Sequence, residues 1–288
     1  MESQAANPDL LRLDSLYYLY FRGQEGGHDR IGYATSAVEC FDGATWDINS
    51  TPVIDVGGDG DPDEVHALDP ATVLVGDTVY LYYSAVSKTC PRSICVATSR
   101  DGRRFVKYSG SPVVIGGGPE IVVRDGVFYL YYWQGHRKGF QLHLARSTDG
   151  FSFAEVGEPV LPVGPPGAWD SMTTETPRIF CEGDDYFMMY CGSDRFADYP
   201  FCAGLAWSRD LITWQRYAEN PVFCRGDEGA WDEGAIWFTT VENIEGEYYL
   251  WYEGYGGGTA RTEQYGSYLR GGKSQIGLAM SVTKPLST

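Results

Sequence analysis

Hydrophobic positions along this chain recur as five short aromatic runs. Each run ends thirteen residues after a proline or, in the last copy, after a threonine. The leading residues are Pro8, Pro70, Pro119, Pro177 and Thr239, and the runs are Tyr18–Phe21, Tyr80–Tyr83, Tyr129–Tyr132, Phe187–Tyr190 and Tyr249–Tyr252. A spacing repeated without insertions predicts a repeated backbone.

Two further features accompany the aromatic runs. The first is an alanine-to-serine element at Tyr33–Ser36, Val96–Ser99, Leu144–Ser147, Leu205–Ser208 and Leu278–Ser281. The second, found in four copies, is a turn followed by an aromatic residue and a Pro-Val pair. The turns begin at Asp42, Asp101, Asp149 and Asp210, and the pairs begin at Pro52, Pro112, Pro159 and Pro221. Periods of about 50 to 70 residues indicate blades or solenoid units.

The segments are rich in Tyr, Val, Phe, Leu and Trp and are bounded by Gly, Asp and Pro, which predicts strands joined by turns. We therefore expect an all-β fold, a five-bladed β-propeller with about four antiparallel strands per blade. The predicted blades of this single domain span approximately 7–55, 63–115, 116–162, 167–224 and 229–288. Inner strands should begin near the five leading residues. The last blade lacks an obvious fourth strand after Ser281, and residues before Asn7 are expected to supply it.

Charge and composition narrow the function. The net charge of −17 and the pI near 4.5 argue against nucleic acid as a partner, because phosphates demand a basic surface. No secretory signal or long apolar span is evident, so we expect a cytoplasmic protein that does not bind membranes. Seven scattered cysteines give neither a disulfide framework nor a zinc pattern, which predicts free thiols.

The repeat itself points to candidate site residues. Inner strands of a propeller line a central funnel. A polar residue that occurs in one blade and not at the equivalent positions of the others is not explained by the shared architecture, so it is a candidate for a functional role. Asp69 directly precedes its proline, where the other copies have Asn7, Gly118, Thr176 and Phe238. Glu175 lies two before its proline, where the other copies have Ala6, Leu68, Gly117 and Trp237. One place after the proline, Asp9, Glu120 and Arg178 are expected on the same strand face as Asn7 and Asp69.

Residues before the inner strands form a second group of candidates. Asp63, Asp170 and Asp232 recur in three blades, which favours loop capping over catalysis. Trp169, Trp231 and Trp237 either stack on a sugar ring or pack between blades. Arg178 either binds substrate or neutralises Glu120 or Asp69. His66 is the one histidine near the predicted channel mouth, and a hydrogen-bonding role is favoured over a metal.

These motifs resemble a known group of enzymes. Asp69-Pro70, Glu175-Thr176-Pro177 and the Ser-x-Asp-Gly turns resemble the five-bladed glycoside hydrolases of family 43 and its relatives in families 32, 68 and 117. The resemblance implies that Glu175 is the general acid and that Asp69 modulates the acid or stabilises an oxocarbenium ion. Family members usually have an aspartate where this chain has Asn7, so Asp9 is assigned as base or nucleophile. Glu233 is a second-rank candidate.

The function implied is a glycoside hydrolase or transglycosylase acting on short oligosaccharides or glycosides, with arabinofuranosyl, xylosyl or fructosyl groups as candidates. A sugar-binding propeller without catalysis, favoured by Asn7, and a propeller recruited to another reaction or to a protein partner remain alternatives. The expected substrate-binding residues are Arg178, Glu120, Trp169, Asp170, Trp237, Asp232, Glu233, His66 and Asn7. No cofactor or catalytic metal is expected, and the sequence neither predicts nor excludes a structural calcium ion. The insertion 255–273 is expected to overhang the pocket. The sequence leaves the oligomeric state open.

Overall fold

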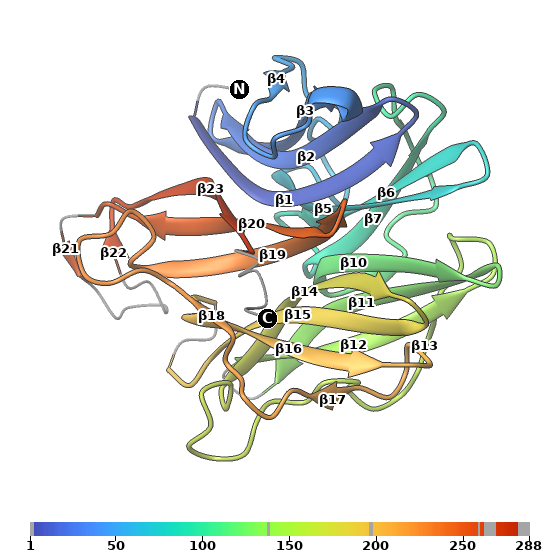
Figure 1. Ribbon diagram of the computed structural model, residues 1–288. Coiled ribbons are helices and arrows are strands. Elements are labelled where there is room, and N and C mark those ends of the chain that lie inside the picture. The colour runs from blue at the N-terminus through green and yellow to red at the C-terminus, as the bar shows by residue number, and fades with distance from the viewer. Residues whose placement is uncertain (1–2, 137–138, 196–197, 259, 262–268, 282–288) are drawn as a thin grey trace.

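The computed structural model describes residues 3–136, 139–195, 198–258, 260–261 and 269–281. Five antiparallel sheets surround a central axis, and the first strand of each sheet lies nearest the middle of the ring (Figure 1). Each inner strand contacts the inner strands of the two neighbouring blades, including the first and the fifth. The predicted all-β, five-bladed β-propeller is therefore confirmed.

Each blade begins at its inner strand and proceeds outward in sequence order. Blade 1 contains β1 (Ser3–Leu13), β2 (Leu16–Glu25), β3 (His28–Ala37) and β4 (Asp47–Ile48), with the 3₁₀ turn η1 (Val38–Cys40). Blade 2 contains β5 (His66–Val75), β6 (Thr78–Val86), β7 (Ser93–Ser99), β8 (Val106–Lys107) and β9 (Val114–Ile115). Blade 3 contains β10 (Gly117–Arg124), β11 (Val127–His136), β12 (Gly139–Ser147) and β13 (Ala154–Glu155).

The last two blades complete the ring. Blade 4 contains β14 (Thr173–Glu182), β15 (Asp185–Ser193), β16 (Cys202–Ser208), β17 (Gln215–Arg216) and β18 (Phe223–Cys224). Blade 5 contains β19 (Ala235–Ile244), β20 (Glu247–Gly256) and β23 (Lys273–Met280). The short strands β21 (Ala260–Arg261) and β22 (Leu269–Arg270) pair with each other in the insertion between β20 and β23.

A β-bulge interrupts every inner strand at the leading residue of the repeat. The strands begin a few residues earlier than predicted, and the proline or Thr239 lies inside them, directly after a residue with positive φ. These left-handed residues are Asn7, Asp69, Gly118, Thr176 and Phe238, with φ of 51°, 57°, 57°, 48° and 50°. The strand register shifts at the same point in all five blades. An extra residue at a bulge re-aims the side chains around it.

Aromatic runs fill the interfaces between blades. Successive strand residues point to opposite faces, so each run packs against both neighbouring blades. In the first run, Tyr18 and Tyr20 belong to a buried cluster shared with blade 2, whereas Leu19 belongs to one shared with blade 5. Such buried clusters occupy all five interfaces. The repeat spacing thus encodes the packing that holds the ring together.

The Asp turns of blades 1 to 4 each bind the preceding blade of the ring. Tyr20 donates to the carbonyl of Gly102 and Tyr82 to that of Gly150, both at 2.7 Å. The ring closes in the same way, because Trp251 Nε1 of blade 5 donates to the Gly43 carbonyl of blade 1 at 2.9 Å. Each contact links the third residue of an aromatic run to the turn of the next blade.

One prediction about closure of the ring is wrong. Residues before Asn7 extend the inner strand of blade 1, where Ala5 pairs with Gly23 and Ala6 with Arg22 of β2. They therefore do not provide an outer strand for blade 5, whose sheet has three strands among the described residues. The pairing of β1 with β2 continues on both sides of the bulge, which keeps this segment in its own blade.

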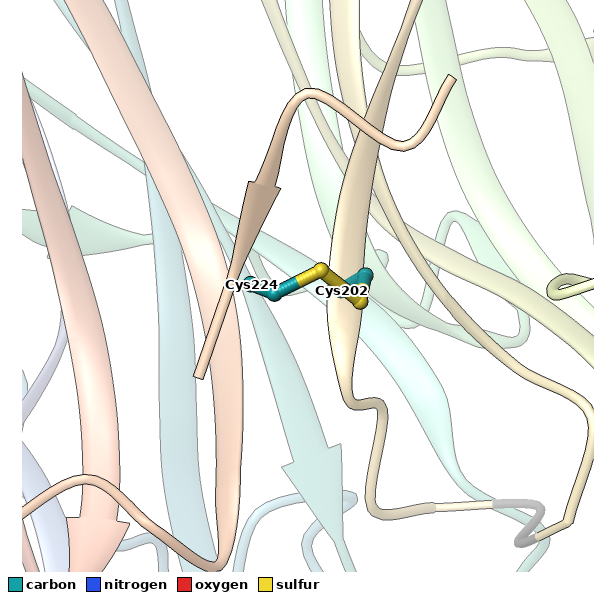
Figure 2. The surroundings of a disulfide bond; sticks show 2 residues. All are labelled: Cys202 and Cys224. Atoms are coloured by element: carbon teal, nitrogen blue, oxygen red, sulfur yellow. A yellow bond between two sulfur atoms is a disulfide. The ribbon is translucent and has the colours of Figure 1, made fainter. Parts of the chain in front are cut away.

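The prediction of free thiols is wrong for two cysteines. Cys202 and Cys224 form a disulfide that joins β16 to β18 in blade 4 (Figure 2). Their strands pair at these two residues, which places the sulfur atoms side by side. Disulfides are rare in cytosolic proteins, so the cysteines do not support the predicted cytoplasmic location. No helix within the described part of the chain is long and apolar enough to span a membrane.

Candidate active site

A pocket of about 340 Å³ lies over the bulges at the axis of the ring. Its walls come from the bulge residues and from the cross-strand partners of the residues that precede them. Asn7, Asp69, Glu175, Trp237 and His66, all named from the sequence, contribute to the lining. Three other hollows are larger. Those of about 670 and 610 Å³ lie at the outer seams between blades and contain none of the candidate catalytic carboxylates, and one of about 370 Å³ contains the second-rank candidate Glu233.

Glu175 is a buried carboxyl group at the wall of this pocket. It is 1% exposed, and its Oε1 has no hydrogen-bond partner among the described residues. The pKa of Glu175 is raised well above its ordinary value, chiefly by burial and then by the negative charges of Asp198 and Asp69. This environment favours the protonated form of the carboxyl group and leaves Oε1 available to a ligand.

Asp69 occupies the left-handed bulge position of blade 2. It is buried, and burial raises its pKa even though Arg92, a hydrogen bond from Ser84, Arg22 and Arg178 all favour the ionised form. Aspartate tolerates a left-handed backbone better than most residues. The bulge turns this side chain toward the same pocket as Glu175.

Asn7 and Glu253 form a pair across the seam between the first and fifth blades. Asn7 Nδ2 donates to Glu253 Oε2 at 2.7 Å, and the backbone N–H of Asn7 donates to the same oxygen at 3.3 Å. Arg22 Nη2 lies 3.2 Å from Glu253 Oε1. Burial raises the pKa of Glu253, and Arg22, Ser274 and Asn7 offset part of that effect. The fifth blade thus supplies a carboxylate beside the position where blade 1 has an amide.

Asp198 and Arg92 approach the pocket from loops. Asp198 is an exposed residue of the loop between β15 and β16. Desolvation of its carboxyl group raises its pKa, with Arg92 opposing the effect and Asp69 and Glu253 adding to it. The Arg92 guanidinium lies over the Trp133 ring, 5.5 Å from its centre. Both side chains adjust the charge around Glu175.

Aromatic side chains form one wall of the pocket. Trp237 packs edge-on against Tyr199 at 5.2 Å and against Tyr255 at 6.3 Å between ring centres. Trp133 faces the same pocket from blade 3. Flat apolar surfaces beside carboxyl groups suit the binding of a sugar ring. Of the three predicted tryptophans, Trp237 lines this pocket.

His66 and Asp29 form a pair at the edge of the pocket. His66 Nδ1 lies 3.0 Å from Asp29 Oδ2 and 3.0 Å from the backbone nitrogen of Asp29. Burial would raise the pKa of Asp29, but His66, Arg22 and Arg92 together hold it below its ordinary value. His66 therefore has a hydrogen-bonding partner, and Asp29 stays ionised.

Three predicted residues lie beyond the bulge, outside the pocket lining. Arg178 pairs with Glu120 at 3.0 Å, and both are buried. Asp9 accepts hydrogen bonds from the Thr72 backbone at 3.0 Å and from its hydroxyl at 2.6 Å. Burial raises the pKa of Asp9 to about 6 and that of Glu120 to about 8. The bulge separates this layer from Asp69 and Glu175.

The remaining candidates hold loops in place. Asp170 accepts from Tyr190 at 3.2 Å and from Arg216 at 3.0 Å, and Asp232 accepts from Tyr252 at 2.9 Å. In each case the tyrosine ends the aromatic run of the same blade. Trp169 stacks on Tyr190 at 5.5 Å, Trp231 lies 5.6 Å from Tyr252, and Glu233 Oε2 accepts from the Gly229 backbone at 2.7 Å. These contacts match the loop-capping and packing alternatives.

Sequence reasoning missed Glu253, Arg22, Asp198 and Arg92. The sequence contained a signal for Glu253 and Arg22, because both are charged residues that directly follow an aromatic run. The equivalent positions in the other blades are Ser84, Trp133 and Cys191. In every blade this position pairs with the residue two before the leading residue, as Trp237 pairs with Glu253. Asp198 and Arg92 lie on loops outside the repeated elements and had no such signal.

No cluster of three or more His, Cys, Asp or Glu side chains suited to a metal occurs within the described ranges. The sequence analysis named no residues that would bind a structural calcium ion. The base of the insertion 255–273 reaches the pocket through Tyr255 and Gly272. Residues 262–268, where a lid was expected, lie outside the described residues.

Comparisons with known proteins relate this chain to carbohydrate-active enzymes. The model of glycoside hydrolase family 130, described as β-1,4-mannooligosaccharide phosphorylase, matches residues 111–253. A protein of Mycobacterium tuberculosis described as uncharacterized is 26% identical over 265 residues, covering 84% of this chain and 85% of that protein.

Solved structures share the fold at low sequence identity. A thermostable family-43 glycoside hydrolase superimposes with a TM-score of 0.69 at 18% identity, covering 98% of this chain and 93% of that one. A glycosyl hydrolase from Bacteroides ovatus gives 0.73 at 16% identity, with coverages of 98% and 85%. A structure from a study of the GH130 mannoside phosphorylases, described as containing glycoside hydrolases that target β-1,2 mannosidic linkages in Candida mannan, gives 0.71 at 17% identity, with coverages of 99% and 86%. The chain thus has the propeller fold of glycoside hydrolases and glycoside phosphorylases, and the resemblance to family 43 is confirmed for the fold.

Proposed function

We propose that this protein cleaves glycosidic bonds in the axial pocket, with Glu175 as the general acid. The observation that carries the proposal is the buried Glu175 carboxyl group, whose Oε1 lacks a partner among the described residues and whose pKa is raised. Glycoside cleavage requires a protonated acid at the leaving oxygen. Glu175 meets that requirement in a pocket that also contains aromatic side chains.

A second carboxyl group must act in its ionised form, either as base or as nucleophile. Asp9 was the candidate, but it lies outside the pocket lining, so we assign this role to Glu253. Its two hydrogen bonds from Asn7 and its ion pair with Arg22 favour the charged form. Asp69 is proposed to raise the pKa of Glu175 and to stabilise positive charge that develops on the sugar.

The substrate class that we propose is a β-linked mannoside or short mannooligosaccharide. The match of residues 111–253 to a mannooligosaccharide phosphorylase model supports this choice over the arabinofuranosyl, xylosyl and fructosyl groups expected from the family-43 resemblance. The pocket volume of about 340 Å³ suits a small substrate, at the lower end of typical ligand sites.

Phosphorolysis is a second candidate, favoured by two arginines in the pocket lining. Arg22 and Arg92 both face the ligand space, and guanidinium groups bind phosphate through paired hydrogen bonds. Five carboxyl groups line the same pocket, namely Asp29, Asp69, Glu175, Asp198 and Glu253. This surplus of acidic groups opposes the entry of a phosphate dianion, so we rank hydrolysis first.

Product analysis tests the proposal. Purified protein is incubated with β-1,2- and β-1,4-linked mannooligosaccharides and with aryl arabinofuranosides, xylosides and fructosides, each with and without inorganic phosphate. We expect free mannose without phosphate from at least one mannoside, and mannose 1-phosphate would instead support phosphorolysis. Binding without turnover across the panel would favour the sugar-binding alternative and contradict the catalytic assignment.

A further inference from the structure

The side chain of Arg178 connects the bulges of the five blades. Its Nη2 donates to the carbonyl of Pro70 and its Nη1 to the carbonyl of Pro119, both at 2.9 Å. Its Nε donates to the hydroxyl of Thr240 at 3.2 Å, and that hydroxyl donates to the carbonyl of Pro8 at 2.7 Å. Arg178 itself belongs to blade 4, so these contacts reach the other four blades.

The bonded carbonyls belong to the residues that directly follow the left-handed bulge positions. Pro70 follows Asp69, and Pro8 follows Asn7. A left-handed backbone at a residue other than glycine is unfavourable and persists where the surroundings hold it. A hydrogen bond to the carbonyl of the next residue restrains the backbone rotation that would release this left-handed conformation. Arg178 therefore restrains the backbone under the pocket residues Asp69 and Asn7.

Charge balance alone does not explain an arginine at this position. Glu120 is its carboxylate partner, and the pair is buried, where the cost of desolvation offsets much of the attraction. Lysine would supply the same charge, but it presents three donors on one atom. Guanidinium presents five donors in a fixed plane, which suits acceptors arranged around an axis.

We propose that Arg178 is a positioning residue of the active site, which fixes the directions of Asp69 and Asn7 by binding the bulge carbonyls from below. It does not line the pocket, and it acts on the substrate only through these residues. The catalytic part of this inference rests on the proposed function, whereas the geometric part does not. The competing explanation is a buried ion pair that stabilises the ring and leaves the pocket unaffected.

Three variants separate these explanations. Arg178→Lys keeps the charge and removes the planar set of donors. Thr240→Val removes the link to blade 1 and leaves the ion pair with Glu120 intact. Arg216→Lys is the matched control, because Arg216 pairs with Asp170 at 3.0 Å and also binds a carbonyl, that of Pro162, in a loop away from the pocket.

Crystal structures of the variants test the geometry without any assay of activity. We expect Arg178→Lys to fold, with Asp69 and Asn7 displaced and the aromatic runs in place. Thr240→Val should displace Asn7 and leave Asp69 unchanged. Both residues in their native positions in the two variants would overturn the proposal, whether or not the wild type cleaves sugars. Should Arg178→Lys fail to fold, Thr240→Val decides the question.

Kinetics add a measurement that a purely structural role would not change. If the wild type cleaves a mannoside, Arg178→Lys should lower kcat by about 10- to 100-fold, because small misplacements of catalytic groups have effects of that size. KM should stay within about twofold, because the pocket residues other than Asp69 and Asn7 keep their positions, and Arg216→Lys should keep the wild-type kcat. Equal losses of kcat in Arg178→Lys and Arg216→Lys would contradict positioning. A wild type without turnover sinks the proposed function, and the crystal structures then decide this inference alone.

Discussion

Asn7 Nδ2 donates a 2.7 Å hydrogen bond to Glu253 Oε2 across the seam that closes the ring. The resemblance to family 43 places a carboxylate at position 7, and this chain instead has an amide that binds a carboxylate from the neighbouring blade. A carboxyl group is therefore retained in the pocket, supplied by blade 5. This arrangement makes the departure at Asn7 compatible with catalysis.

Asn7→Asp tests this pairing. The change puts two carboxyl groups at hydrogen-bonding distance in a buried site, where one of them must take up a proton. Ionising both would cost free energy, so the variant should be destabilised at pH 8 by about 1 to 3 kcal/mol and much less at pH 5. Urea unfolding at the two pH values measures this difference.

The control for that experiment is Asn243→Asp. Asn243 donates to Glu182 Oε1 at 2.9 Å in an exposed pair, where solvent screens the new charge. It should change stability little at either pH. Equal effects of the two substitutions would contradict a special pairing of Asn7 and Glu253.

Asp198→Asn should shift the alkaline limb of the pH–rate profile. Asp198 is the nearby charge that most raises the pKa of Glu175, so removing it lowers that pKa. Glu175 acts in its protonated form, and activity is lost as pH rises through its pKa. The limb should therefore move to lower pH, as a profile of kcat/KM would reveal. Asp194 lies on the same loop but is not one of the charges that shift the pKa of Glu175, so Asp194→Asn should leave the limb in place.

The Asp9→Asn variant tests the effect of the buried carboxyl groups below the pocket on stability. Burial raises the folded-state pKa of Asp9 to about 6, of Glu242 to about 7 and of Glu120 to about 8, above the ordinary values of 3.8 for Asp and 4.5 for Glu. The folded state binds more protons in this range, so the free energy of unfolding should fall between about pH 4 and pH 8.

The variant should reduce this pH dependence, because it removes one of the contributing groups. Its kcat should equal that of the wild type, because Asp9 lies outside the pocket lining. Guanidinium unfolding across this pH range and a rate at neutral pH provide the two measurements. A large loss of kcat in a stable Asp9→Asn variant would restore Asp9 to the mechanism.

The sequence predicted the ring because every blade repeats the spacing between a bulge residue and an aromatic run, and that spacing sets the strand register. It predicted Glu175 and Asp69 because their counterparts in other blades are uncharged. Glu253 was missed because the comparison covered the inner strand and not its partner. The disulfide depends on the pairing of β16 with β18, a tertiary relationship between Cys202 and Cys224 that cysteine counting does not reveal.

Removal of this disulfide should destabilise blade 4. Cys202 and Cys224 are 22 residues apart, and closing a loop of that length contributes about 3 kcal/mol through the unfolded state. The double variant Cys202→Ser/Cys224→Ser should lose about that much in urea unfolding under oxidising conditions. Cys90→Ser, which replaces an exposed thiol, is the control and should be neutral. Equal stability of the double variant and the wild type would contradict a bridge in the folded protein.

Leaving-group dependence of Glu175→Gln tests the central assignment most directly. Glutamine cannot donate the proton, so kcat/KM for a mannooligosaccharide should fall by about 10²- to 10⁴-fold. With a dinitrophenyl mannoside, whose leaving group needs no proton, the loss should be far smaller, and Glu233→Gln should match the wild type on both substrates. Equal losses on the two substrates, or wild-type activity on the oligosaccharide, would contradict Glu175 as the general acid.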